Sequence, residues 1–246
     1  MDPRPIELSI ILPAYNEEEN IERAMEAATK VGDRLCARHE ILVVDDGSRD
    51  RTAEIVLAAG RVDPRIKLIS HETNRGYGHA LRSGFSAATM DLVFFTDADN
   101  QFDLDELEVF LPSIEHADVV AGFRFNRQDP FIRRFFAKGW NAIVRVLFYA
   151  PVRDIDCAFK LFRRDVFTDI NLEAMGAMVS TELMVRIARA GKSVVEIGVT
   201  HYPRTAGRAR GADPRVILRA IVELRQMYVR LRAAGYQDTR SLRRPA

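Results

Sequence analysis

The chain of 246 residues has only two cysteines and no long apolar run. Cys36 and Cys157 have no partner at metal-ligand spacing, which argues against a cysteine-based metal site and indicates a reduced, cytoplasmic protein. The nearest candidate for a membrane span, residues 142–152, is short and carries Arg145 in its middle. The first residues also lack the basic and apolar blocks of a signal peptide. We therefore expect a soluble or peripheral protein.

The net charge of +1 conceals an uneven distribution along the chain. Residues 1–122 hold 24 acidic against 12 basic side chains, whereas residues 201–246 hold 11 arginines against 3 acidic side chains. Arginine suits forked contacts with phosphate groups or anionic lipid headgroups. We expect such anions as partners, and no nucleic acid.

Short apolar runs alternate with helical patterns along the first half of the chain. Apolar runs at 8–12, 41–44, 66–69, 92–96 and 118–123 predict strands, and segments beginning at 21, 52 and near 78 predict helices. Asn16 and Glu19 have capping-box spacing, so we expect Asn16 to cap the first helix. Repeated strand–helix units predict a doubly wound, mostly parallel α/β sheet. We expect one domain over residues 1–236 and a frayed tail over 237–246.

The most informative stretch is the fourth strand, which ends in Asp97-Ala98-Asp99. Alternation along an extended chain points Asp97 and Asp99 the same way, and small Ala98 leaves room for a ligand. Converging carboxylates repel each other, so a hard divalent cation is their natural partner, and such cations usually accompany phosphates. An isolated D-x-D is more often a solvated turn.

This D-x-D is not isolated, because polar residues follow the other predicted strands as well. Residues 13–17, 45–46 and 74–76 each come directly after a strand, and the carboxyl ends of parallel strands share one edge of the sheet. Arg124 ends the fifth strand, where it could meet phosphate oxygens or pair with a structural carboxylate.

The second half of the chain is more ambiguous. Residues 130–152 form an amphipathic pattern with aromatic and basic residues, which suits a membrane surface, a dimer contact or a core face. Residues 154–162 predict a strand returning to the site, and Glu182 opens a helix where it could cap the helix or reach the substrate. A last strand at 193–199 precedes a basic, glycine-bearing loop that could close over a polyphosphate, and residues 214–233 predict a final helix.

Taken together, these motifs resemble the inverting glycosyltransferases of family 2, which have the GT-A fold, and within them the dolichyl- or polyprenyl-phosphate sugar synthases. The resemblance covers residues 8–220 and implies a GT-A domain with a nucleotide-binding half and an amphipathic helical insertion. It implies a nucleotide-sugar site formed by Pro13, Tyr15, Glu17, Val44, Asp45, Asp46, Arg75, Asp97, Ala98, Asp99, Arg124, Arg204 and Arg210. Asp97, Asp99 and Gln101 would ligate Mg²⁺ or Mn²⁺.

The implied reaction moves a mannose- or glucose-type sugar from a GDP- or UDP-linked donor to a polyprenyl phosphate, with Asp97, Asp99 and Arg124 in the catalytic centre. A phosphate acceptor is already ionised and needs no general base. A hydroxyl acceptor would need one, for which Asp156 and Glu182 are the candidates. Because the membrane helices that often end such proteins are not found in this sequence, we expect peripheral docking on the cytoplasmic face of the membrane. A homo-oligomer is left open.

Two other classes of function compete with this one. A phosphatase of the haloacid dehalogenase class also uses a D-x-D at a strand end, but on its first strand, whereas here the motif follows the fourth. A non-catalytic protein that binds sugar nucleotides on the same fold is the other alternative.

Overall fold

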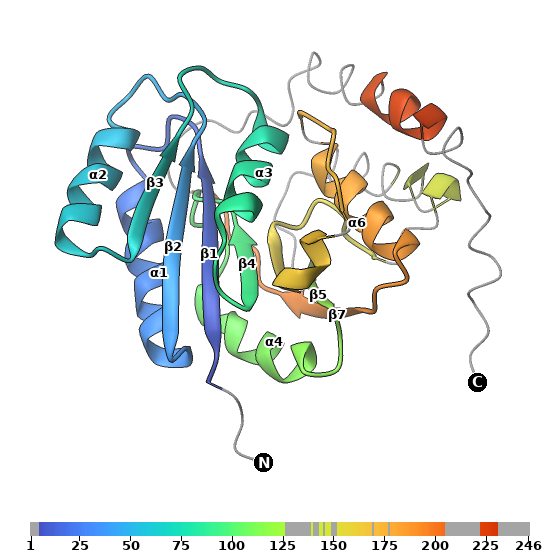
Figure 1. The fold of residues 1–246 in the computed structure, drawn as a ribbon, viewed down its shortest axis with the longest axis horizontal. Coiled ribbons are helices and arrows are strands. Elements are labelled where there is room, and N and C mark those ends of the chain that lie inside the picture. Colours follow the sequence, from blue (N-terminus) through green and yellow to red (C-terminus); the bar gives the residue numbers. More distant parts are fainter. Residues whose placement is uncertain are drawn as a thin grey trace.

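A computed structural model of the chain describes residues 5–125, 139, 143–144, 146–148, 152–168, 170–176, 178–204 and 222–230. Within these residues, one sheet lies between two sets of helices (Figure 1). The strands are β1 (Glu7–Ala14), β2 (Arg38–Asp45), β3 (Ile66–Ser70), β4 (Leu92–Thr96), β5 (Val119–Arg124), β6 (Phe159–Arg163) and β7 (Val194–Val199). Their order across the sheet is β3-β2-β1-β4-β6-β5-β7. Only β6 is antiparallel to its neighbours, so the predicted mostly parallel α/β sheet is confirmed.

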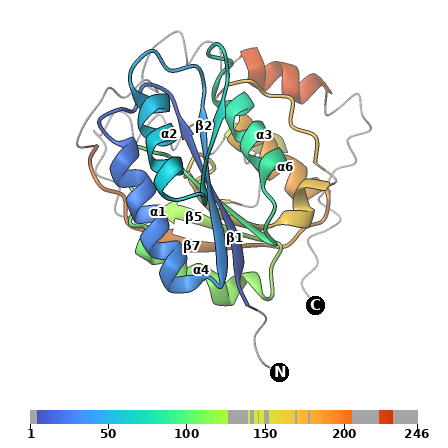
Figure 2. The same cartoon turned by 60° about the vertical axis from the view of Figure 1, so that its left-hand side comes forward.

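Helices cover both faces of the sheet (Figure 2). Helices α1 (Ile21–Leu35), α2 (Thr52–Val62) and α4 (Leu107–Ile114) pack on one face, and α3 (Tyr77–Ala87) and α6 (Val179–Arg189) pack on the other. Short 3-10 turns at Leu104–Glu106 and Arg164–Thr168 precede α4 and follow β6. Within the described ranges, we find no helix that combines the length and the apolar composition of a membrane span.

Strand β1 shows how the sequence builds this core. Leu8, Ile10 and Leu12 are fully buried in the apolar cluster on one face, while Ile11 is fully buried in the cluster on the other. A strand that is apolar on both faces must lie inside the sheet with helices on each side. The continuous apolar run in the sequence therefore explains why β1 lies inside the sheet, between β2 and β4.

The expected cap of the first helix is wrong. Asn20, not Asn16, precedes the first residue of α1. Asn16 adopts a left-handed conformation with φ of 54°, and it exchanges hydrogen bonds with the loop after β2. Its side chain accepts from the Arg49 amide at 2.7 Å, and its own amide donates to the Ser48 hydroxyl at 2.8 Å. Contacts between two loops have overridden the local capping signal.

Several expectations for later segments are also corrected. The expected strand over 154–162 begins only at Phe159. Helix α4 was not predicted from the sequence, and it contains Pro112 in its interior. The expected segment over 130–152 is described only in part, and its Val144 and Phe148 are buried in the core. Of the expected final helix, residues 222–230 are described and helical.

Candidate active site

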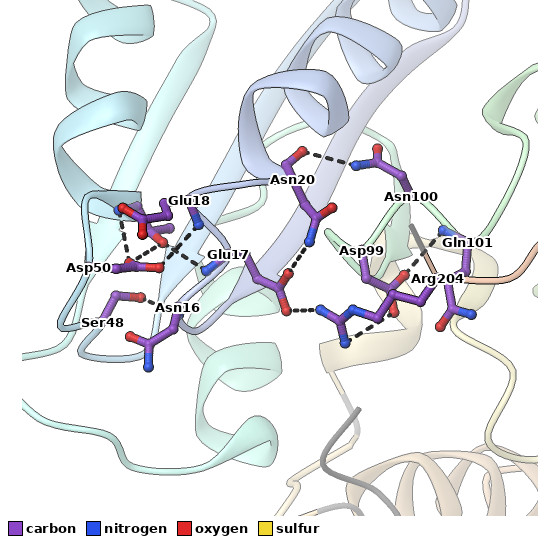
Figure 3. Close-up of polar contacts among 11 residues, drawn as sticks. Asn16, Glu17, Glu18, Asn20, Ser48, Asp50, Asp99, Asn100, Gln101 and Arg204 are labelled. Atoms are coloured by element: carbon purple, nitrogen blue, oxygen red, sulfur yellow. Dashed lines mark hydrogen bonds and ion pairs between the residues drawn. The ribbon is translucent and has the colours of Figure 1, made fainter. Parts of the chain in front are cut away.

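The predicted convergence of loops at the carboxyl edge of the sheet is present in the structure. Ala14 and Asp45 are paired in register where β1 and β2 end, so the loops that follow these strands start side by side. The Glu17 amide donates to the Thr52 hydroxyl at 2.9 Å, and the Glu18 amide donates to the Asp50 carboxylate at 3.2 Å (Figure 3). The first two loops therefore form one hydrogen-bonded unit.

The buried carboxylate of Asp46 organises a third loop. It accepts hydrogen bonds from the backbone amides of Arg75 at 2.9 Å and Gly76 at 2.8 Å, and it contacts Nδ1 of His71 at 2.7 Å. Gly76 has φ of +96°, a conformation that side chains disfavour, and an added Cβ would lie 2.4 Å from the Met175 carbonyl oxygen. Asp46 thus holds the turn that begins α3 against the end of β2.

Tyr77, the first residue of α3, connects this turn to the D-x-D. Its hydroxyl donates to Oδ1 of Asp97 at 2.8 Å. Burial raises the pKa of Asp97 to about 7, and the negative charge of Asp99 adds to the shift, while Tyr77, Arg124 and Lys160 oppose it. Burial also raises the pKa of Asp99. At both carboxylates the cost of burial therefore outweighs the attraction of the nearby positive charges.

Arg204 crosses the site from the end of the chain's last described strand. Its guanidinium pairs with Oε1 of Glu17 and lies 3.9 Å from Oδ2 of Asp99 (Figure 3). Glu17 is held in turn by Asn20, whose side-chain amide donates to Oε2 at 2.7 Å. The segment before Arg204 is tied to Gln101, since Gln101 and Tyr202 exchange hydrogen bonds of 2.8 and 2.9 Å. Residues more than 100 positions apart thus form one edge of the site.

The third side of the site holds two cationic side chains that are largely buried, Arg124 and Lys160. Arg124 makes a forked contact with Asp154, with Nε at 2.6 Å and Nη2 at 2.8 Å from the carboxylate oxygens, and both side chains are about nine-tenths buried. Beside them, the fully buried Lys160 donates to the carbonyl oxygens of Ile155, at 3.1 Å, and Cys157. Burial lowers the pKa of Lys160. Arg124 thus has the structural carboxylate partner that we considered from the sequence, close enough to Asp97 to influence it.

Tyr77 and Lys160 were missed by the sequence reasoning. Lys160 had a signal, because a single cation inside the apolar run Phe159–Arg163 is costly unless it is paired. Tyr77 had none, since its partner is set by the packing of α3 against β4.

The remaining predicted residues have different positions. Pro13 and Val44 pair in register near the ends of β1 and β2, just before the first two loops. Ala98, which lies between Asp97 and Asp99 in the sequence, is buried. Tyr15 follows β1 directly, and Asp45 accepts a hydrogen bond from the Ser48 amide at 3.1 Å. The Arg75 side chain is exposed.

The two candidate bases differ in their surroundings. Asp156 is exposed and contributes negative charge near Tyr77, Arg124 and Lys160. Glu182 is buried, and its carboxylate accepts from the amides of Glu173 at 2.8 Å and Ala174 at 2.7 Å and pairs with Arg186. The contacts of Glu182 therefore stabilise the 173–174 loop, and its role as a base stays a prediction. Arg210 lies outside the described residues.

The D-x-D fits a hard divalent cation by its chemistry. In the part of the chain that the structure describes, no three His, Cys, Asp or Glu side chains are grouped to hold a metal. Two carboxylates and the amide oxygen of Gln101 nevertheless offer oxygen ligands, and Mg²⁺ is commonly held by one or two carboxylates, with water and substrate phosphates completing its shell. Burial raises the pKa of both Asp97 and Asp99, so a bound divalent cation would stabilise their ionised forms.

Comparison with known proteins shows the family and the fold of the chain. A model of the family described as "Glycosyl transferase family 2" matches residues 9–170. The undecaprenyl-phosphate 4-deoxy-4-formamido-L-arabinose transferase of Photorhabdus laumondii is 31% identical over 208 residues, which are 82% of this chain and 62% of that protein. The enzyme of the same name from Pectobacterium atrosepticum is 32% identical over 215 residues, with the same coverage. The chain thus spans about three-fifths of the length of these curated relatives.

Solved structures share the fold. Mannosyl-3-phosphoglycerate synthase from Rubrobacter xylanophilus has a TM-score of 0.70 at 22% identity, covering 98% of this chain and 79% of that one. Glucosyl-3-phosphoglycerate synthase from Mycobacterium tuberculosis, in complex with Mn²⁺, UDP and phosphoglyceric acid, has a TM-score of 0.68 at 22% identity, covering 95% and 80%. These likenesses confirm the predicted GT-A fold. The family match argues against the phosphatase alternative, while a non-catalytic protein of the same fold stays a prediction.

Proposed function

The chain belongs to glycosyl transferase family 2, and from this premise we propose that it transfers a sugar from a nucleoside diphosphate donor to a polyprenyl phosphate. The observation that carries the donor half of the proposal is the D-x-D beside Arg204 and Arg124 at the edge where the loops converge. The acceptor half is supported by the curated relatives, whose names specify undecaprenyl phosphate.

The donor nucleotide would lie over the loops after β1 and β2. Base and ribose would contact Pro13, Tyr15, Glu17, Val44, Asp45, Asp46 and Arg75, and the diphosphate would lie along Asp97, Ala98 and Asp99. Asp97, Asp99 and Gln101 would hold Mg²⁺ or Mn²⁺, which when bound would offset the charge of the departing diphosphate. Because Asp46 already accepts hydrogen bonds from Arg75 and Gly76, its contribution to nucleotide binding includes the shape of that loop.

The chemical step needs few groups from the protein. An oxygen of the acceptor phosphate forms a bond to the anomeric carbon from the face opposite the diphosphate, and the bond from that carbon to the diphosphate breaks with its electron pair. The configuration is inverted. Arg204 and Arg124 carry positive charge to the side where negative charge grows, and such preorganised charge stabilises the transition state. The acceptor phosphate is ionised at neutral pH, so no base has to remove a proton.

A hydroxyl acceptor remains the second candidate within the family. It would require a general base, and of the two predicted candidates Asp156 is the exposed one. Glu182 would have to give up two backbone hydrogen bonds and its pairing with Arg186 to serve.

We also propose that the protein meets its lipid acceptor peripherally, at the cytoplasmic face of the membrane. The 11 arginines after residue 200 support this, because they suit anionic headgroups. Val144 and Phe148 do not contribute to such a surface, since both are buried in the core. The other residues of 130–152, and a homo-oligomer, stay predictions.

The donor site can be tested by thermal unfolding with GDP, UDP or ADP, each with and without Mn²⁺. A ligand that binds the native state raises its melting temperature by mass action. We expect a metal-dependent rise with GDP or UDP that is lost in Asp99→Asn and kept in Asp91→Asn, an exposed residue just before β4. If no nucleotide shifts the melting temperature at millimolar concentration, the donor-site assignment is wrong.

The acceptor is tested by product analysis. Undecaprenyl phosphate should gain one sugar when it is incubated with the correct donor. The donor panel should include mannose- and glucose-type nucleotide sugars and the 4-deoxy-4-formamido-L-arabinose donor that the relatives' name indicates. Transfer to a hydroxyl-bearing acceptor alone would favour the second candidate.

A further inference from the structure

Arg204 lies between two carboxylates that come from different loops. Its guanidinium pairs with Glu17 from the loop after β1 and with Asp99 from the loop after β4 (Figure 3). The three side chains are 18%, 15% and 13% exposed, so water screens their interaction only in part. Part of the positive charge that a bound cation could supply to Asp99 is thus supplied by the chain itself.

The backbone around Arg204 holds it in this position. Gln101 and Tyr202 exchange two hydrogen bonds, and Phe102 and His201 form an antiparallel bridge. The Phe102 and His201 rings also meet edge to face, with centroids 5.3 Å apart. Arg204 therefore reaches Asp99 from an anchored segment that is bonded to the D-x-D loop itself.

From these contacts we infer that Arg204 is the internal counter-cation of the donor site, and that it competes with the divalent cation for Asp99. The inference rests on the proposed function. The guanidinium lies 3.9 Å from Oδ2 of Asp99, so a divalent cation that takes this oxygen repels Arg204 and displaces it from Asp99. A displaced Arg204 stays next to the site, where a nucleoside diphosphate offers it a new anionic partner.

This competition has a thermodynamic consequence. A divalent cation that binds alone breaks the contact between Arg204 and Asp99 and leaves nothing in its place. When a nucleoside diphosphate binds together with the cation, Arg204 gains a contact with the diphosphate instead. The two ligands should therefore bind cooperatively, and the coupling must be reciprocal. Removing the guanidinium should have opposite effects on the two ligands, tightening the cation and weakening the nucleotide.

The test measures Mn²⁺ affinity directly, from the electron paramagnetic resonance signal of free Mn²⁺, with and without the nucleoside diphosphate. Wild type is compared with Arg204→Gln, with Arg204→Lys, which keeps the charge, and with Arg61→Gln, an exposed residue in the last turn of α2. For Arg204→Gln we expect about three- to tenfold tighter Mn²⁺ binding without nucleotide, in line with a partly screened ion pair. Nucleotide binding at saturating Mn²⁺ should weaken by about tenfold or more. Arg61→Gln should match wild type, and Arg204→Lys should keep the weaker Mn²⁺ binding of wild type.

Other results would overturn the inference. Arg204→Gln with unchanged or weaker Mn²⁺ binding would show that the guanidinium does not compete, although the proposed donor site would survive if nucleotide binding still depended on Asp99. Equal tightening in Arg204→Lys would show that charge is not the cause. Mn²⁺ binding that is unaffected by Asp99→Asn would instead overturn the metal site of the proposed function. Circular dichroism of each variant checks that it is folded.

Discussion

Replacing Asp97 with asparagine should stabilise the protein without ligand, and more at pH 8 than at pH 5. Burial and the neighbouring Asp99 hold the pKa of Asp97 at about 7, far above its ordinary value of 3.8. An ionised Asp97 therefore destabilises the folded state relative to the unfolded chain. An asparagine side chain removes the charge and still accepts the hydrogen bond from the Tyr77 hydroxyl.

The magnitude follows from the pKa difference between the folded and unfolded states. Below about pH 4 the carboxyl is protonated in both states and costs nothing. As the pH rises towards 7 the unfolded chain ionises and the folded state does not, so stability falls by ~1.4 kcal/mol per pH unit. With a folded pKa of about 7, the cost is about 2 kcal/mol at pH 5 and about 4 kcal/mol above pH 7. Asp97→Asn should recover these amounts.

The assay is urea unfolding, followed by circular dichroism at pH 5 and pH 8 in the presence of a metal chelator. Asp91→Asn, at an exposed position just before the same strand, is the matched control and should stay within about 0.5 kcal/mol of wild type at both pH values. A gain for Asp97→Asn that is equal at both pH values, or a loss of stability at pH 8, would refute the reasoning. The variant should also lose metal-dependent nucleotide binding, so that stability and function change in opposite directions.

Two further predictions concern buried charges. Asp154→Ala leaves the buried guanidinium of Arg124 without its forked partner and should lower the free energy of unfolding by about 3–5 kcal/mol, measured by urea unfolding; a loss below about 1 kcal/mol would contradict it. Burial raises the pKa of Glu40, but hydrogen bonds from Lys67, Ser9 and Thr89 outweigh it and lower the pKa to about 2. This stabilisation is complete above about pH 4.5 and is lost as the pH falls towards 2, so Glu40→Gln should cost about 2–3 kcal/mol at pH 7 and clearly less at pH 3. A deficit that does not depend on pH would contradict this account.

The arrangement of strands shows how far a local pattern reaches. Apolar runs identified β1 to β5 and β7. The signal was clearest for β1, β2 and β4, because a strand buried on both faces needs continuous apolar residues. The same pattern could not show that β6 is inserted antiparallel between β4 and β5, since strand order depends on contacts between distant segments. It also missed α4, where Pro112 obscured the helical signal.

The site divides in the same way. The D-x-D at the end of a buried strand, and the polar residues after the neighbouring strands, predicted one shared edge because parallel strands end together. Individual partners were beyond this reasoning. Nothing local to Tyr77 indicates Asp97, and Arg204 pairs with Glu17 across 187 positions of sequence.

The sequence by itself determined the α/β class, the edge of the sheet at which polar residues gather, and the two carboxylates that mark it. These features depend on the periodicity of the backbone, which repeats over a few residues and can be read locally. The tertiary structure decided which cation faces which carboxylate. In it, Glu182 accepts a hydrogen bond from the Glu173 amide, and Arg204 lies between Glu17 and Asp99. Pairing of this kind depends on how separate loops pack, because the energy of a charge is set by its distance to every neighbour in space.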